Sequence, residues 1–257
     1  MLPKLISKPN LSSAWAEALV YIIDNPGLEA SPLVINIHNL EDSNPPEISS
    51  FRKALDHFLI DNNQQNVNTV ANTIFPESLW LFADGDRQKL YDLYKKNLKR
   101  YKRLEPQKNK RGLYFERLIS FGQNGPFDGN QLEFIISEFN NNPKNRRRSK
   151  FQASIFDPER DHLTTPRLGF PCLDHVSFVP NKKGITLNAF YAKQLLVEKG
   201  YGNYLGLYRL GNFMASQMNL KLTNLNCFIG VEGLGGSGIT KACLSELSNT
   251  AREILEV

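Results

Sequence analysis

The chain has 257 residues, of which 41% are hydrophobic and 22% charged, and its formal net charge is +5. This length can bury one substantial core, and nothing in the sequence forces a division, so we expect a single domain over residues 1–257. No apolar run approaches the roughly 18 residues that span a bilayer, and the N-terminus lacks a secretion signal. The 3 cysteines show no C-x-x-C spacing, which argues against a disulfide framework or a structural zinc site. We therefore expect a soluble, cytoplasmic protein without membrane contact.

In the first half of the chain, apolar periodicity and breaker residues predict mainly helices. The first helix has Ser12 or Ser13 as its expected N-cap, and Asn25-Pro26-Gly27 ends it. The expected elements are a helix at 11–23, a strand at 32–37, a loop at 41–46, helices at 48–60 and 79–101 with an interruption around 83–86, and a charged, mobile connection at 105–111.

The second half mixes strands and helices, so the predicted fold class is α+β. Asp128 is the expected cap of a helix that runs to Phe139, because apolar residues line one of its faces. The glycine-rich segment 230–238 has no phosphate-loop spacing and is interpreted as a flexible turn. The expected elements are a helix at 128–139, strands at 151–156, 176–179 and 184–190, a long apolar helix at 201–218, and an amphipathic helix after residue 238.

Basic residues gather in two stretches, at 95–111 and 144–150. Such clusters attract anions, either nucleic acid or the phosphate of a small nucleotide. For the first stretch a solvated surface is the favoured interpretation. Tyr91, Tyr94 and Tyr101 have helical spacing there, and we expect them to pack inside the protein and not to stack on bases.

Cys172 is the main candidate for a catalytic residue. No motif of His, Cys or acidic residues in the sequence indicates a metal site. It follows Pro171 at the end of a loop and precedes a strand candidate, where nearby cations could favour a reactive thiolate. From the residues alone the alternative stays open, since a free cysteine is often simply a small buried hydrophobe.

Several segments around Cys172 occur in a distinctive order. An arginine pair and a strand candidate precede Cys172, and Asn203 lies 31 positions after it (203 − 172). In this order the chain resembles the thymidylate synthase superfamily, which includes thymidylate synthases and pyrimidine nucleotide hydroxymethylases. The resemblance is strongest over 128–230. Its segments are Glu77-Ser78-Leu79-Trp80-Leu81-Phe82-Ala83-Asp84-Gly85-Asp86, Asn142-Pro143-Lys144-Asn145-Arg146-Arg147, Pro171-Cys172-Leu173, Leu187-Asn188-Ala189-Phe190-Tyr191, Tyr201-Gly202-Asn203 and Met214-Ala215-Ser216-Gln217-Met218-Asn219-Leu220.

The resemblance implies a sandwich of a mixed β-sheet with packed helices, and a pyrimidine nucleotide as substrate. Cys172 would add to C6 of the base, so that C5 attacks a one-carbon donor, which is methylenetetrahydrofolate in the family. Arg146 and Arg147 would bind the 5′-phosphate, in the family across the interface of a homodimer. Asn203 would bind the base edge, and Glu77 would organise water and proton transfer near the base.

The chain also departs from the family at several site positions. The histidine and glutamine that follow the family's cysteine are Leu173 and Ser177 here. The R-S-x-D segment is replaced around 191–195, where Lys193 is the substitute cation. The H-x-Y pair that holds the sugar is lost within 230–235, and a predicted helix replaces the closing C-terminal tail.

Three functions are therefore weighed. The first is a divergent enzyme that modifies C5 of a pyrimidine nucleotide by methyl or hydroxymethyl transfer. The second is an inactive homologue that still binds a nucleotide. The third, which is not favoured, is a basic protein that binds nucleic acid, with Cys172 incidental.

Overall fold

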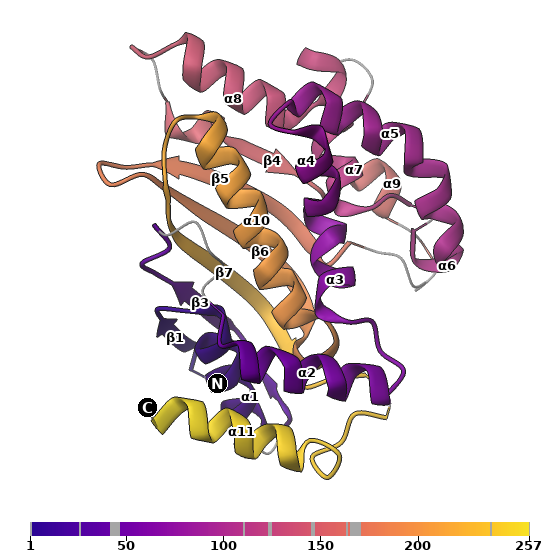
Figure 1. The fold of residues 1–257 in the computed structure, drawn as a ribbon, viewed down its shortest axis with the longest axis vertical. Coiled ribbons are helices and arrows are strands. Elements are labelled where there is room, and N and C mark those ends of the chain that lie inside the picture. The colour runs from indigo at the N-terminus through magenta and orange to yellow at the C-terminus, as the bar shows by residue number, and fades with distance from the viewer. Residues whose placement is uncertain are drawn as a thin grey trace.

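The computed structural model describes residues 2–25, 27–41, 47–109, 111–122, 125–144, 147–162, 164, 171–236 and 238–256. Within these ranges the fold is α+β, as the sequence predicts, with helices packed against one mixed sheet (Figure 1). The strands are β1 (Lys4–Lys8), β2 (Glu29–Ala30), β3 (Leu33–Ile37), β4 (Gln152–Ser154), β5 (Leu173–Pro180), β6 (Ile185–Leu195) and β7 (Leu222–Gly233).

The strand order is β1-β3-β7-β6-β5-β4, and β2 pairs with the end of β7. β1 runs parallel to β3, and β6 runs parallel to β7, whereas the other neighbours are antiparallel. Because β5 is antiparallel to β6, the beginning of β5 lies beside the end of β6. The ends of β6 and β7 meet there as well, since those strands are parallel.

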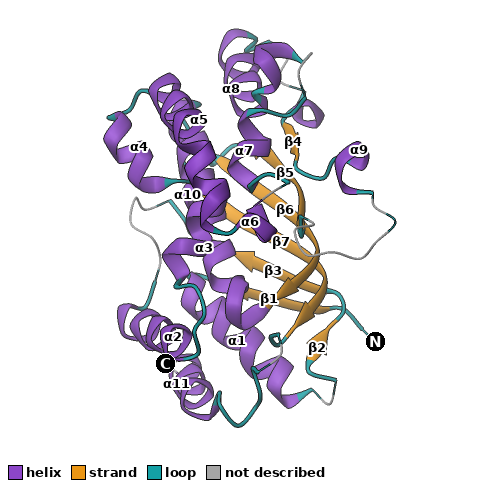
Figure 2. Cartoon of the chain, turned by 90° about the vertical axis from the view of Figure 1, so that its right-hand side faces the viewer, coloured by secondary structure: helices purple, strands orange, loops and turns teal. Residues whose placement is uncertain are grey.

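Helices cover one face of this sheet. Figure 2 shows α1, α2, α3, α10 and α11 on the same side of the strands. No helix in the described ranges is long and apolar enough to cross a membrane. The helices are α1 (Leu11–Asp24), α2 (Ser49–Asp61), α3 (Val67–Ile74), α4 (Glu77–Ala83), α5 (Arg87–Leu104), α6 (Pro106–Asn109), α7 (Tyr114–Ile119), α8 (Gln131–Asn141), α9 (Pro158–Asp161), α10 (Tyr201–Gln217) and α11 (Ser245–Glu256), with short turns η1 (Pro126–Gly129), η2 (Arg148–Lys150) and η3 (Leu196–Gly200).

α10 is the central helix of the core. It approaches α3 closely because Gly202 and Gly206 face that helix: an added Cβ at Gly202 would lie 2.5 Å from the Val70 Cβ atom. On the other side of the core, the fully buried Trp15 donates from Nε1 to the Leu196 carbonyl oxygen at 3.0 Å. This bond ties α1 to η3, which leads directly into α10.

Two helix starts and one connection differ from those that the sequence predicts. Asn10, rather than Ser12 or Ser13, caps α1, because its side chain accepts from the Ser13 N–H at 2.7 Å. Asn130 caps α8 in the same way, and Asp128 lies before it in η1 with φ 54°. The connection at 105–111 contains the short helix α6. Of the predicted loop at 41–46, residues 42–46 lie outside the described ranges.

Other predicted elements are confirmed within a few residues. The strand at 32–37 is β3, and the helix at 79–101 divides into α4 and α5 around Asp84 to Asp86. The apolar helix at 201–218 is α10. β7 extends to Gly233, so part of the predicted glycine turn is strand.

The sheet face opposite the helices carries a row of polar side chains. Asn226 at its centre accepts from Asn36 Nδ2 at 2.6 Å and donates to Asn188 Oδ1 at 2.8 Å. Ser7 donates to Asn36 at one end, and Asn188 donates to Ser177 at the other. One row of hydrogen bonds therefore crosses β1, β3, β7, β6 and β5.

An aromatic row runs beside this polar row. The rings of His175 and Phe190 stack at 5.7 Å between centroids, and those of Phe190 and Phe228 stack at 5.2 Å. Phe228 is 40% exposed. This uncharged row and the polar row together form what we call the open sheet face.

Candidate functional site

Cys172 lies where the strand ends meet. It immediately precedes β5, and its carbonyl oxygen accepts from the Ala192 N–H of β6 at 3.0 Å. The next residue of β6 is Lys193, which is exposed, while Cys172 itself is half-buried. The predicted nucleophile and the predicted substitute cation are therefore neighbours.

The surroundings of Cys172 favour the neutral thiol. Burial raises the pKa of the thiol most, and the Asp174 carboxylate raises it further. Lys193 and Lys199 lower that pKa, although they do not offset the first two effects. A reactive thiolate therefore requires that ligand binding lower the pKa of Cys172.

Asp174 titrates near neutral pH. Burial and the negative charge of Asp161 together raise the pKa of Asp174 to about 6. Asp161 keeps its charge because buried Arg117 binds it with two hydrogen bonds, Nη1 to Oδ2 at 2.5 Å and Nη2 to Oδ1 at 2.8 Å. Arg117 thus holds α9, the last described helix before Cys172, against α7.

A group of buried polar side chains lies at the same end of the sheet. Gln194 of β6 is paired in register with Glu232 of β7, and both are almost completely buried. All four of their side-chain oxygen and nitrogen atoms lack a hydrogen-bond partner among the described residues. Each such atom costs about 1–3 kcal/mol when nothing binds it, so four together are unusual in a core.

Two tyrosines extend this group. The hydroxyl groups of Tyr191 and Tyr204 are buried and also lack a partner in the described part of the chain. Burial raises the pKa of Tyr204, and Glu232 and Cys227 add to this effect, which shows that these groups lie close together. Tyr191 lies near Cys227 and Cys172, and a thiolate at either position would raise its pKa further. Tyr191 and Tyr204 therefore lie in the same buried region as Cys172 and Glu232.

Burial decides the charge of Glu232. Desolvation raises its pKa well above the ordinary value of 4.5, which favours the neutral carboxyl group. A neutral carboxyl group is both a hydrogen-bond donor and an acceptor. We call Gln194, Glu232, Tyr191 and Tyr204 the buried polar group.

The sequence did not identify this group. Glu232 follows the apolar run of β7, and an acidic residue there is a detectable signal, because isolated acids seldom occur in buried strands. Its pairing with Gln194 depends on the register of β6 and β7, which the sequence does not reveal.

The other predicted site residues lie in different surroundings. Asn203 is buried in the first turn of α10, next to Tyr204. Arg147 is exposed at the start of η2, and Arg146 lies outside the described residues. Glu77 begins α4 and forms an ion pair with Arg209 of α10 at 2.6 Å, and no described contact joins it to Cys172.

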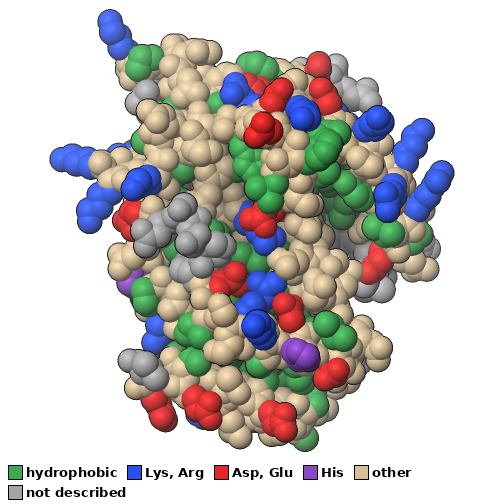
Figure 3. Space-filling view, in the orientation of Figure 1, with side chains coloured by type: hydrophobic (Ala, Val, Ile, Leu, Met, Phe, Trp, Pro, Cys, Tyr) green, Lys and Arg blue, Asp and Glu red, His purple; other side chains and the backbone are tan. Residues whose placement is uncertain are grey.

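The basic stretch on α5 resembles a solvated surface, as predicted. Tyr91 and Tyr94 are buried, so they cannot stack on bases. The space-filling view shows lysine and arginine side chains projecting at the upper right, over the region of α5 and α6 (Figure 3). The exposed ones on α5 include Lys95, Lys96, Lys99, Arg100 and Arg103.

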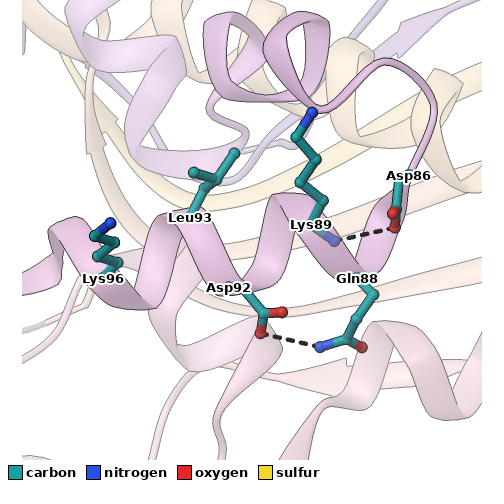
Figure 4. A pocket seen from close by; sticks show the side chains of 6 residues that line it. All are labelled: Asp86, Gln88, Lys89, Asp92, Leu93 and Lys96. Atoms are coloured by element: carbon teal, nitrogen blue, oxygen red, sulfur yellow. Dashed lines mark hydrogen bonds between the residues drawn. The ribbon is translucent and has the colours of Figure 1, made fainter.

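A surface hollow of about 350 Å³ lies along the first turns of α5 (Figure 4). Its polar groups already bind one another: Gln88 donates to Asp92 at 3.0 Å, and the Lys89 N–H donates to Asp86 at 3.0 Å. It is distant in sequence from Cys172 and carries no comparable set of unpartnered groups. Among the described residues, no group of three His, Cys, Asp or Glu side chains could hold a metal ion.

Comparison with known proteins adds no family assignment. The sequence matches no protein-family model and no curated protein.

Proposed function

We propose that this chain is a divergent thymidylate synthase-like enzyme that modifies C5 of a pyrimidine nucleotide by methyl or hydroxymethyl transfer. The observation that carries the proposal is the position of Cys172: its half-buried thiol lies near Lys193 and near the buried polar side chain of Tyr191. The order of the segments that resemble the family supports the same function.

In the proposed reaction, the Cys172 thiolate forms a bond to C6 of the base. The electron pair of the C5–C6 double bond moves toward the carbonyl group at C4, which leaves C5 nucleophilic. A one-carbon donor would then supply its carbon to C5, with cleavage of the bond that held this carbon in the donor. The transferred carbon would take up a hydride from the donor to become a methyl group, or water to become a hydroxymethyl group. Loss of the C5 proton and release of the Cys172 thiolate would restore the C5–C6 double bond. Lys193 favours this chemistry because its positive charge lowers the pKa of the thiol.

Phosphate and base would be bound at different places. Arg147 is exposed, so it can reach a phosphate, and Arg146 would act beside it from the same arginine run. Asn203 is buried and would bind the base, as its position in the family pattern implies. Glu77 keeps its proposed catalytic role only if its ion pair with Arg209 opens.

Methylenetetrahydrofolate is the donor that the resemblance implies. The family closes its site with a C-terminal tail, whereas here the last helix, α11, packs on α1, where Arg252 binds Asp24 at 2.7 Å. The described residues therefore do not fit that closing role, and we assign no residue to the folate.

The homodimer that the resemblance implies would form through the open sheet face. This face is uncharged along its centre, where Asn188, Asn226, Phe190 and Phe228 lie, so two copies can meet without like-charge repulsion. Such pairing would also cover Phe228. A reduced Cys172 agrees with the cytoplasmic location that the cysteine pattern predicts.

An inactive nucleotide-binding homologue is the second candidate. The observation in its favour is the raised pKa of Cys172, which keeps the thiol neutral in the free protein. Binding of nucleic acid has less support, because Tyr91 and Tyr94 on α5 are buried and Tyr101 is half-buried.

Covalent trapping tests the enzyme directly. A 5-fluoro-2′-deoxyuridine nucleotide with methylenetetrahydrofolate should form an adduct on Cys172, since fluorine cannot leave C5 as a proton does. Intact-protein mass spectrometry measures the adduct, and Cys172→Ala is the control. If nucleotides raise the melting temperature equally in both proteins and no adduct forms, the inactive homologue is correct.

A further inference from the structure

The pairing of Gln194 with Glu232 brings two neutral polar groups to one place. Neighbouring strands lie about 4.8 Å apart, and residues paired in register project from the same face. Both side chains therefore project from the same face of the sheet, and both are buried. Although they are close, neither binds the other, and no described residue binds either of them.

The first turn of α10 and its approach cover this pair. A Cβ atom added to Gly200 would lie 3.4 Å from Gln194 Oε1, so the amide lies beneath the junction of η3 and α10. Tyr204, one turn into α10, has its unpartnered hydroxyl near Glu232. Three side chains from two strands and one helix thus converge at this junction.

The hydrogen-bonding groups of Gln194 and Glu232 indicate which kind of ligand they would bind. In its neutral form, which burial favours, the Glu232 carboxyl group offers a donor and an acceptor, and so does the Gln194 amide. Phosphate and carboxylate groups are poor ligands here, because Glu232 has no cationic partner among the described residues and the pair is deeply buried. A flat, neutral ring edge with adjacent donor and acceptor atoms satisfies both side chains.

We propose that Gln194 and Glu232 bind the hydrogen-bonding edge of the pyrimidine ring, and are the residues that determine specificity for the base. This inference rests on the proposed function, and it adds two residues that the family pattern does not supply. Uracil and cytosine both carry such an edge, so the two bases must be compared.

The test is calorimetric titration of the full chain with 2′-deoxyuridine and 2′-deoxycytidine 5′-monophosphates. Glu232→Met and Gln194→Met keep the length of the side chain but remove its hydrogen bonds. Each should weaken binding of the preferred nucleotide about tenfold or more, because the unpaired ring edge is buried without a partner. Glu232→Gln keeps a donor and an acceptor, and it should restore binding to within a few-fold of the natural protein.

Two controls separate recognition from a general loss of structure. Thr223→Val removes another buried polar group of β7, at the opposite end of the strand, and should leave affinity within about twofold. 2-Deoxyribose 5-phosphate lacks the base, so its binding should be equal in the natural protein and in both methionine variants. Melting curves check that each variant is folded. If Glu232→Met does not fold, the loss of nucleotide affinity is tested with Gln194→Met alone.

The outcomes are distinct. Nucleotide binding that stays within about twofold in both methionine variants overturns this inference and leaves the proposed function standing, with the buried polar group then a site for internal water. If the natural protein binds neither nucleotide, the proposed function fails and this inference fails with it.

Discussion

At the scale of single residues, opposing charges surround the Cys172 thiol. Asp174 raises the pKa of Cys172, and Lys193 lowers it. The raised pKa of Asp174 depends in turn on Asp161, which Arg117 holds in place. The reactivity of Cys172 is therefore set by residues from α7, α9, β5 and β6, and not by a single neighbour.

Removing these charges one at a time should move reactivity in opposite directions. Asp174→Asn should speed alkylation of Cys172 by iodoacetamide at pH 7.5 by about two- to tenfold, because the thiolate loses a repelling charge. Lys193→Gln should slow it by a similar factor. The rate is followed by peptide mass spectrometry in a Cys243→Ser background, since Cys243 is exposed.

These substitutions have clear controls. Cys172→Ser should abolish labelling at this peptide, and an exposed-lysine change on α5, Lys99→Gln, should leave the rate unchanged. A slower reaction in Asp174→Asn than in the natural protein contradicts the assignment of charges.

At the scale of elements, the open sheet face depends on β7, the central strand. Its asparagines alternate with apolar residues, so one of its faces binds Asn36 and Asn188 while the other enters the core. α1, α2, α3, α10 and α11 cover the second face (Figure 2). The first face is the one through which we propose that two copies pair.

Phe228→Asp should therefore shift the protein from dimer to monomer, because it places a charge at the centre of a self-pairing surface. Analytical ultracentrifugation over a range of concentrations measures the change. Leu81→Asp is the matched control, since Leu81 is 73% exposed on α4, which lies among the helices. A natural protein that is monomeric at all concentrations contradicts the proposed pairing.

Elements that depend on residues close together in the sequence could be predicted from the sequence. The break between α4 and α5 and the apolar helix α10 are examples, because glycine, aspartate and apolar spacing act within a few residues. β1 was not predicted, since its edge position leaves Leu5 exposed and its pattern short. The buried polar group was missed for a different reason: Gln194 and Glu232 meet only through strand pairing between distant segments.

At the scale of the whole molecule, burial of Glu232 makes stability depend on pH. Its folded-state pKa is raised, so the folded protein holds a proton that the unfolded chain releases above pH 4.5. The free energy of unfolding should therefore fall as pH rises, by about 1.4 kcal/mol for each pH unit, until Glu232 ionises in the folded state. This contribution to stability is complete only below pH 4.5.

Glu232→Gln removes this proton, so the stability of this variant relative to the natural protein should grow as pH rises from 5 towards 7. Urea unfolding at several pH values measures the difference. The raised pKa of Asp174 acts in the same direction below about pH 6, but it is present in both proteins and cancels. Thr223→Val, which removes no titrating group, should show a constant difference across this range, and a constant difference for Glu232→Gln would contradict the prediction.

The bond from Trp15 to Leu196 has an optical consequence. The indole is fully buried, and an added Cβ at Gly200 would lie 3.3 Å from its Nε1 atom, at the same junction that covers Gln194. Of the 2 tryptophans in the chain, the other, Trp80, lies half-buried against Phe213 on α10. The molecule thus carries a natural fluorophore at the junction of η3 and α10, where its emission reports on the packing above the buried polar group without any attached dye.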